Sequence, residues 1–271
     1  LSQKARDEAV ELMLASKNLL LPSNGTPVTL PNREMSLGAY FMTYTMEEKP
    51  KDDAVFADFE EAIYANQAGK LDLHTMINVR NEGKMMQTTV GRILFNEVVP
   101  KNIGFVNKIV EGKLIRTLVT QAYETCDNET VRQFIDDLKA LGFKYADKAG
   151  ISIGIVDCVI HPDRDRVIEE ADERVAEIDS SYKNGLITRD EMRAISNDIW
   201  IETTEKVQKM TWDYMEFLNP LKMVVEAGAR GSKDQVKQLQ GMRGLVADPS
   251  GRIVELPTKS NFRQGLMVFE Y

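Results

Sequence analysis

The sequence predicts a mostly helical α+β fold built from two or three modules. With 271 residues, 43% of them apolar, the chain can bury a real core, and a charged fraction of 28% is ordinary for a soluble protein. Two long segments, 167–182 and 192–214, carry apolar residues at helical spacing on either side of a short turn. Shorter apolar runs between turn signals precede them and predict a few strands.

The first part of the chain mixes helix and strand signals. Ser2 is placed to cap an opening helix with one apolar face, and residues 23–27 are rich in turn formers. We then expect short strands at 28–30 and 37–45, a surface loop at 49–53, and a helix over about 54–68 that ends at Gly69.

Further elements are expected up to residue 157. A strand pair, 76–80 and 87–90, should turn at 81–83. Helices follow at about 105–125 and 128–141, the second ending at Gly142. Residues 150–157 alternate small and apolar side chains, which indicates a buried strand or a tight connection.

The two long periodic segments should form an antiparallel helical hairpin. Thr188 and Glu191 match a capping box at the start of the second helix. The first helix should be roughly 30 Å long at 1.5 Å per residue. Each helix has one apolar seam and a charged outside, which favours a hairpin that projects into solvent. The tip residues invite a docking role, although such tips also complete the packing of a hairpin: Asn184, Gly185, Leu186 and Ile187.

A glycine-bearing loop before a capped helix is a candidate phosphate contact. Ser232 and Gln235 form a second capping-box pattern, so a helix should run from Ser232 to about Leu239. Open N–H groups and the helix dipole favour an anion there, and Arg230 adds a forked cation just before the turn. The alternative is a plain connection, because the chain has no Gly-x-x-x-x-Gly-Lys-Ser/Thr stretch and most such loops bind nothing.

After this helix we expect a bend at Gly241 and Gly244, then a hairpin of 245–247 with 253–256 across 248–251. The charge is uneven around it. Residues 163–218 hold 15 acidic and 8 basic side chains, whereas 226–271 hold 5 and 7. The overall charge of −8 argues against an independent nucleic-acid-binding domain, and the acidic segment indicates a solvated face or a docking surface for a basic partner.

Other residue types exclude some classes of function. Cys126 and Cys158 lack a Cys-x-x-Cys spacing, so they predict neither a disulfide framework nor a zinc site and favour a reducing cytoplasm. His74 and His161 are far apart, and we expect surface or capping roles for both. No apolar run approaches the ~20 residues needed to span a bilayer.

Blocks spread along the chain occur in an order that resembles a known family. They are LLLPSNG at 19–25, TTVGRILFN at 88–96, FKYA at 143–146 with GISIGI at 150–155, EAGARGS at 226–232, and DPSGRIVELP at 248–257 with NFRQGL at 261–266. They resemble the largest-subunit family of multisubunit RNA polymerases, in its bacterial beta-prime form. The weakest correspondence covers about residues 43–87. Gln264 and Glu226 depart from the family, which usually has Glu and Ser there.

This resemblance implies an internal piece of a catalytic subunit that is inactive alone. In the family, the aspartates that hold the catalytic magnesium precede such a segment, and the bridge helix and the mobile loop follow it. We therefore expect Mg²⁺ in the whole enzyme and no metal site here. The implied modules are a mixed pore module at 1–160 that lines the secondary channel, the rim hairpin at 161–221, and an active-site-proximal module at 222–271.

The resemblance also implies roles for single residues. Arg230 would contact the β- or γ-phosphate of the incoming nucleotide. The loop that supports the bridge helix would contain Ser232, Gln238, Arg243, Asn261 and Arg263. The hairpin tip would dock regulatory or transcript-cleavage factors. Implied partners are the beta, alpha, omega and sigma subunits, template DNA, RNA and nucleoside triphosphates, in the cytoplasm at the nucleoid and without a membrane.

Two other classes of function stay open from the residues alone. A non-catalytic module that docks a partner through its hairpin needs 163–218 and ignores the Arg230 loop, whereas the polymerase role needs both. A self-standing nucleotide hydrolase ranks third, because no metal-binding carboxylate cluster accompanies the loop.

Overall fold

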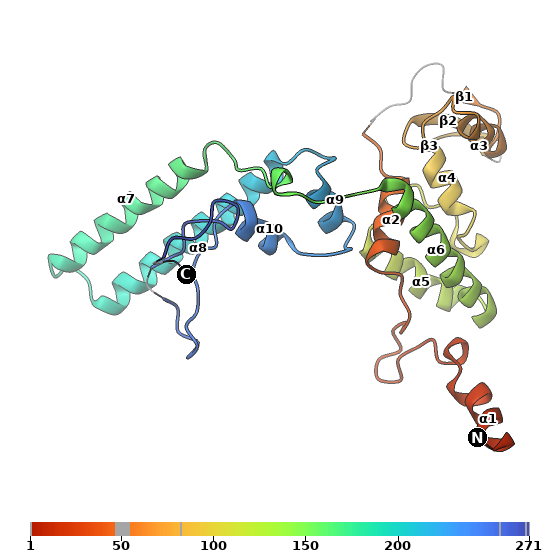
Figure 1. The fold of residues 1–271 in the computed structure, drawn as a ribbon, viewed down its shortest axis with the longest axis horizontal. Helices are drawn as coiled ribbons and strands as arrows, with labels where there is room; N and C mark the ends of the chain where they lie inside the picture. Colours follow the sequence, from red (N-terminus) through yellow and green to blue (C-terminus); the bar gives the residue numbers. More distant parts are fainter. Residues whose placement is uncertain (1, 47–54, 82, 255, 269, 271) are drawn as a thin grey trace. The chain divides into compact units, whose positions relative to one another are not determined.

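The structure, a computed structural model, describes residues 2–46, 55–81, 83–254, 256–268 and 270. Over these residues it is mostly helical with one small three-stranded sheet, so the predicted fold class is confirmed (Figure 1). The chain forms two units, which are described separately below. The first unit comprises 1–151 with 226–230, and the second comprises 152–225 with 231–271.

The first unit places a helical core beside the small sheet. In the sheet, β1 pairs with β2 in parallel, and β2 pairs with β3 antiparallel in the register Met76↔Thr89 to Asn81↔Lys84. One apolar cluster fills the space among α2, α5 and α6, and another lies where the sheet meets α3 and α4. The elements are α1 (Gln3–Glu8), continued by a π-helical turn (Ala9–Met13), α2 (Glu34–Thr43), β1 (Val55–Phe56), α3 (Phe59–Gln67), β2 (Met76–Asn81), β3 (Lys84–Thr89), α4 (Val90–Asn96), α5 (Gly112–Thr125) and α6 (Asn128–Ala149).

Two errors of the sequence prediction share one physical cause. Residues 37–45 were expected as a strand, but 34–43 form α2; Gly142 was expected to end a helix, but α6 continues to Ala149. The two glycines let these helices touch: a Cβ on Gly38 would stand 1.8 Å from the Gly142 oxygen, and one on Gly142 would stand 2.7 Å from the Met35 Cα. A short apolar run buried on most sides gives no period by which helix and strand can be distinguished.

Other elements of this unit match or shift from the prediction. Ser2 caps α1 as expected, accepting a hydrogen bond from the Ala5 N–H at 3.3 Å. The hairpin of β2 and β3 is confirmed, although Val90 belongs to α4. No strand forms at 28–30. The helix expected over 54–68 begins at 59, the one expected over 105–125 begins at 112, and the loop expected at 49–53 lies outside the described residues.

The residues of the TTVGRILFN block connect α4 to other segments of the first unit. Thr89 caps α4, and a Cβ on Gly91 would stand 1.6 Å from the Met42 oxygen, so only glycine fits there. The buried Arg92 donates from Nε to the Thr43 oxygen at 3.0 Å. Asn96 accepts from the Val106 N–H at 2.7 Å. These contacts give the residues of the block a role in stabilising the fold.

The second unit is built on the helical hairpin. Helices α7 (Arg164–Lys183) and α8 (Arg189–Tyr214) lie side by side along a shared apolar seam, with Met242 fully buried against it (Figure 1). Two shorter helices follow, α9 (Pro220–Glu226), whose last residue belongs to the first unit, and α10 (Lys233–Gln240).

The remaining predictions for this unit are partly correct. The hairpin after α10 is confirmed by the Ala247↔Ile253 bridge and the 2.8 Å bond from the Asp248 N–H to the Arg252 oxygen. Helix α9 was not predicted from the sequence. Of the two alternatives expected at 150–157, the buried strand is wrong and the tight connection is confirmed: a 3₁₀ turn, Ile155–Asp157, forms there, with Val156 81% exposed. The division into three modules stays a prediction.

Candidate functional site

The segment before Arg230 is anchored to the first unit by two hydrogen bonds. The Tyr40 hydroxyl of α2 donates to Glu226 Oε2 at 2.7 Å. The Gly112 N–H, at the start of α5, donates to the Ala227 oxygen at 3.1 Å. Tyr40 and Ala227 are 1% and 0% exposed. The backbone at the start of this segment is therefore fixed on the ends of two core helices.

Close backbone packing reinforces these bonds. A Cβ on Gly112 would stand 3.2 Å from the Ala227 oxygen and 3.8 Å from the Gly228 Cα. Gly228 has φ of +68°, a conformation that side chains other than glycine's disfavour. A Cβ at position 112 would thus require the Ala227 oxygen to move by a few tenths of an ångström, and the backbone at 228 favours glycine.

Arg230 lies at the exposed end of the anchored segment. Within the described part of the first unit, its guanidinium has neither a hydrogen bond nor an ion pair. An exposed guanidinium beside an anchored backbone suits the capture of an external anion, because no carboxylate of the described residues is paired with its fork of donors.

Tyr40 is a protonated donor at neutral pH. Burial raises the pKa of its hydroxyl far above the ordinary value, and the neighbouring Glu226 carboxylate raises the pKa further. The hydrogen bond to Glu226 therefore keeps its proton on the tyrosine.

In the second unit, the predicted cap of α10 is confirmed. Ser232 Oγ accepts from the Gln235 N–H at 3.3 Å, and Gln235 Oε1 accepts from the Ser232 N–H at 3.1 Å. These bonds use two N–H groups at this end of the helix. Asp234 adds a carboxylate to the first turn, so the terminus is a weaker anion site than the dipole alone suggests.

Four of the predicted support residues come together at the other end of α10. The Phe262 N–H donates to the Gln238 oxygen and the Arg263 N–H to the Leu239 oxygen, both at 3.0 Å. Asn261 is fully buried and donates from Nδ2 to the Gly241 oxygen at 3.0 Å. The segment around 261–264 is thereby fastened to the end of α10.

Arg243 completes this support. The backbone N–H of Arg243 donates to the backbone oxygen of Ser260 at 3.1 Å, and the Arg243 guanidinium lies 5.7 Å from the centre of the Phe262 ring. Among the five predicted support residues, only Ser232 lies at the start of α10 rather than near its end. The functional role of all five stays a prediction.

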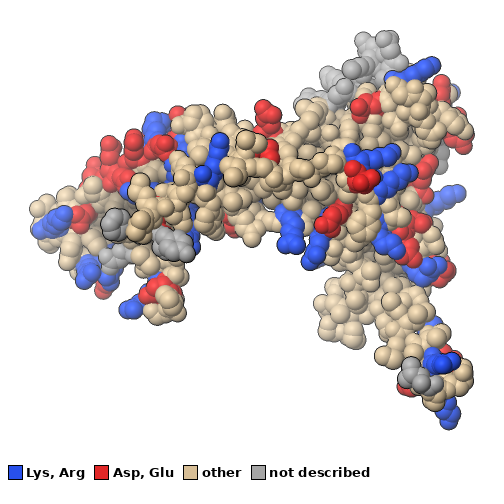
Figure 2. All heavy atoms as spheres, viewed as in Figure 1, with Lys and Arg blue, Asp and Glu red and all other residues tan. Residues whose placement is uncertain are grey.

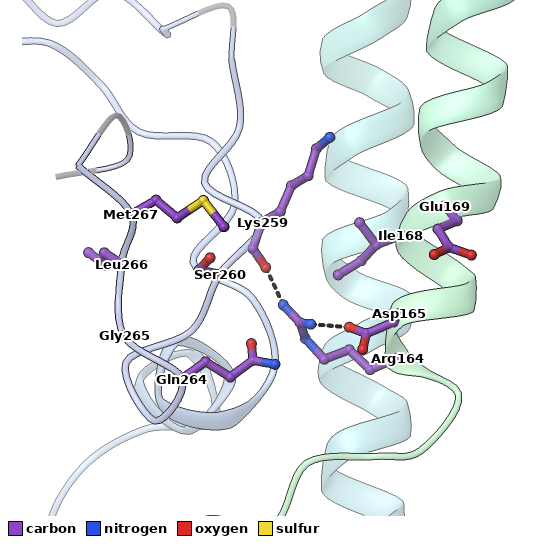
Figure 3. A pocket seen from close by; sticks show the side chains of 10 residues that line it. All are labelled: Arg164, Asp165, Ile168, Glu169, Lys259, Ser260, Gln264, Gly265, Leu266 and Met267. Atoms are coloured by element: carbon purple, nitrogen blue, oxygen red, sulfur yellow. Dashed lines mark hydrogen bonds and ion pairs between the residues drawn. The ribbon is translucent and has the colours of Figure 1, made fainter.

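A residue that the sequence analysis missed links the hairpin to this support. Arg164, the first residue of α7, is 5% exposed and donates from Nε to the Gly241 oxygen at 2.6 Å. Figure 3 shows its guanidinium pointing at the Lys259 oxygen and the Asp165 carboxylate. The Gly241 oxygen also accepts from Asn261, so one carbonyl joins both segments.

The same junction has a second connection through a lysine. Lys259 Nζ lies 2.6 Å from Asp172 Oδ1 of α7 and 5.5 Å from the centre of the Trp200 ring of α8. An open cleft of about 540 Å³ lies beside Arg164, between α7 and the segment 259–267 (Figure 3). Arg164 lies in a charged run, DRDR at 163–166, and no sequence signal separates it from exposed neighbours.

Three of the four predicted tip residues, Asn184, Gly185 and Leu186, are exposed, and Ile187 is half-buried. The Leu186 side chain is 75% exposed, and Gly185 has φ of +74° in the turn. The Thr188 capping box is confirmed, with the Thr188 N–H donating to Glu191 Oε2 at 2.8 Å. Most of the Leu186 surface is open to solvent, and the docking role of the tip stays a prediction. Asp and Glu side chains gather over α7 behind it (Figure 2).

Two features of the described residues bear on other functions. Over the described ranges, no group of three or more His, Cys, Asp and Glu side chains is placed to hold a metal ion. The helices of the same residues are too short or too polar to cross a membrane.

Comparisons with known proteins agree with one another. Residues 18–158 match the family model described as RNA polymerase Rpb1, domain 3, and residues 168–264 match RNA polymerase Rpb1, domain 4. The whole chain is 41% identical to a DNA-directed RNA polymerase subunit beta' of Desulforamulus reducens and 40% identical to that of Pelotomaculum thermopropionicum. A third, from Sulfurihydrogenibium sp., is 38% identical. The chain spans 23%, 23% and 18% of the length of these relatives.

Proposed function

This chain belongs to the largest-subunit family of DNA-directed RNA polymerases, which includes the bacterial beta' subunit, and we propose that it serves nucleotide entry and binding in such an enzyme. In the proposed role, the enzyme adds nucleotides to the RNA 3′ end, and this segment lines the secondary channel. The matches to both domain models and the ~40% identity to beta' subunits support this role. Its partners would be the other polymerase subunits, template DNA and RNA.

The observation that carries the nucleotide role is the exposed guanidinium of Arg230, which follows an anchored backbone and has no ion pair with the described residues. In nucleotide addition, the RNA 3′-hydroxyl attacks the α-phosphate and pyrophosphate leaves, so negative charge builds up on the leaving group. A guanidinium at the β- or γ-phosphate would bind the triphosphate and stabilise that charge. Arg230 would provide this contact.

Metal chemistry would come from other parts of the enzyme. Catalysis of this kind rests on Mg²⁺, and the described residues offer no carboxylate cluster that fits it. We propose that this chain contributes positioning and one positive charge. The rest of the chemistry is assigned elsewhere in the subunit.

A kinetic experiment tests the role of Arg230. In the whole polymerase, Arg230→Ala should lower kcat/KM for a nucleoside triphosphate roughly 10- to 150-fold, since a charge-assisted contact contributes about 1.5–3 kcal/mol. Arg230→Lys should recover part of the loss, because it restores the charge without the fork. Unchanged nucleotide kinetics in Arg230→Ala would refute the assignment.

The exposed hairpin tip favours a second, compatible role as a docking site for regulatory factors. Leu186 is the apolar contact that this role needs. If the docking role were the only one, variants of the tip would change factor binding while Arg230→Ala had no effect on nucleotide addition.

A further inference from the structure

The anchor of the Arg230 segment depends on a side chain pair that touches no proposed substrate group. Residues 226–230 form a five-residue segment that belongs to the first unit, whereas the residues on either side of it belong to the second. At its start, the Glu226 carboxylate is held by the Tyr40 hydroxyl at 2.7 Å. The next residue, Ala227, is held through its backbone by Gly112 at 3.1 Å.

The donor in this pair is itself immobile. Tyr40 lies on α2, is 1% exposed, and its ring stacks on that of Tyr44 with centroids 6.4 Å apart. Its helix is pressed against α6 through the glycine contact at Gly38. The position of the Tyr40 hydroxyl is therefore set by the core of the first unit, and the Glu226 carboxylate takes its position from it.

We propose that Tyr40 and Glu226 are positioning residues that fix the backbone from which Arg230 reaches the triphosphate. This inference rests on the proposed function of Arg230. The pair acts only through the guanidinium, since neither residue lies at the exposed end of the segment. Misplacing a binding group by about 1 Å costs up to ~10²-fold in rate, so a loosened anchor has a measurable effect.

Four variants of the whole polymerase test the proposal: Tyr40→Phe, Glu226→Gln, Arg230→Ala, and Tyr40→Phe with Arg230→Ala. Tyr40→Phe keeps the ring and removes only the hydroxyl. We expect it to raise KM for the nucleoside triphosphate about 3- to 30-fold with a smaller change in kcat. Glu226→Gln keeps an acceptor and should fall between wild type and Tyr40→Phe.

The double variant separates positioning from a general loss of structure. If Tyr40 acts through Arg230, adding Tyr40→Phe to Arg230→Ala should produce no further loss. The same variants should raise KM for pyrophosphate in the reverse reaction, because pyrophosphate carries the phosphates that Arg230 would bind.

Three outcomes would overturn the inference. Normal KM in Tyr40→Phe, with Arg230→Ala impaired, would leave the function of Arg230 intact and reject the positioning role. Multiplicative losses in the double variant would show that Tyr40 acts independently of Arg230. Normal kinetics in Arg230→Ala would reject the proposed function itself, and the positioning role with it.

Discussion

The hydroxyl of Tyr40 and the carboxylate of Glu226, 186 positions apart in sequence, form a 2.7 Å hydrogen bond in the first unit. The tyrosine comes from a core helix and the glutamate from the last residue of α9. This bond connects the interior of the first unit to the segment that presents Arg230, and it makes that segment sensitive to the protonation state of one phenol.

Alkaline pH should destabilise the chain through Tyr40. Burial raises the pKa of Tyr40 in the folded chain above the ordinary value of 10.0. Above pH 10 the unfolded chain releases this proton while the folded chain retains it, so the free energy of unfolding should fall as the pH rises. Denaturant unfolding of the 271-residue chain at a series of pH values measures the slope.

The matched control is Tyr40→Phe, in which the slope above pH 10 should become shallower. Tyr44, Tyr123 and Tyr145 also have pKa values raised by burial, so part of the slope should survive. An identical slope in Tyr40→Phe and wild type would contradict the assignment.

The fold could be predicted wherever a local signal agrees with the tertiary environment. The capping boxes at Thr188 and Ser232 and the turn between β2 and β3 were found because side chain and backbone satisfy each other within a few residues. Helix α2 and the continuation of α6 past Gly142 were not found, because their glycines serve a helix contact distant in sequence.

Replacing Gly142 by alanine should destabilise the chain. In an open helix this change stabilises by about 0.5–1 kcal/mol. Here the new Cβ would stand 2.7 Å from the Met35 Cα and oxygen, so α2 and α6 must separate. We expect a net loss of about 1–3 kcal/mol, as overpacking usually gives, measured by denaturant unfolding.

An exposed site in the same helix supplies the control for that change. Ala140→Gly on α6 should cost roughly 1 kcal/mol from propensity alone. A Gly142→Ala variant more stable than wild type would show that the two helices do not need their close contact.

The candidate site was also only partly visible in the sequence. Arg230 stands out as a cation beside glycines, and Asn261 belongs to a recognisable block. Arg164 does not stand out, because a buried arginine that serves two carbonyls looks the same in sequence as an exposed one in an ion pair. Burial of a charged side chain is decided by distant segments, here Gly241 and Lys259.

Removing the Arg164 guanidinium should destabilise the second unit. Arg164→Met keeps a long apolar side chain and takes the donors from the Gly241 and Lys259 oxygens. The Gly241 oxygen keeps its bond from Asn261, but two hydrogen bonds from a charged group are lost. Each such bond contributes about 1.5–3 kcal/mol, so we expect a loss of about 2–4 kcal/mol in denaturant unfolding.

Arg166→Met is the matched control on the same helix. The Arg166 guanidinium forms an ion pair with Glu170 at 2.5 Å, and the Arg166 side chain is 63% exposed. Loss of this surface ion pair should lower the free energy of unfolding by no more than about 1 kcal/mol. Equal effects of the two substitutions would mean that the buried junction contributes nothing beyond a surface ion pair.

The last prediction concerns the binding of a factor at the hairpin tip. Leu186→Asp replaces an apolar side chain, 75% exposed, by a carboxylate at the end of an acidic hairpin. If the tip docks a factor through apolar contact, the affinity of the whole polymerase for a purified transcript-cleavage factor should fall at least about tenfold, the size expected for a central interface residue. Stability should change by less than about 0.5 kcal/mol, because the side chain packs on little. Ile201→Asp, on α8 away from the tip and 47% exposed, is the control and should leave the affinity unchanged. Equal affinity in the Leu186→Asp variant and wild type would reject the tip as a docking site, since the substitution adds charge at the exposed apolar residue on which that role depends.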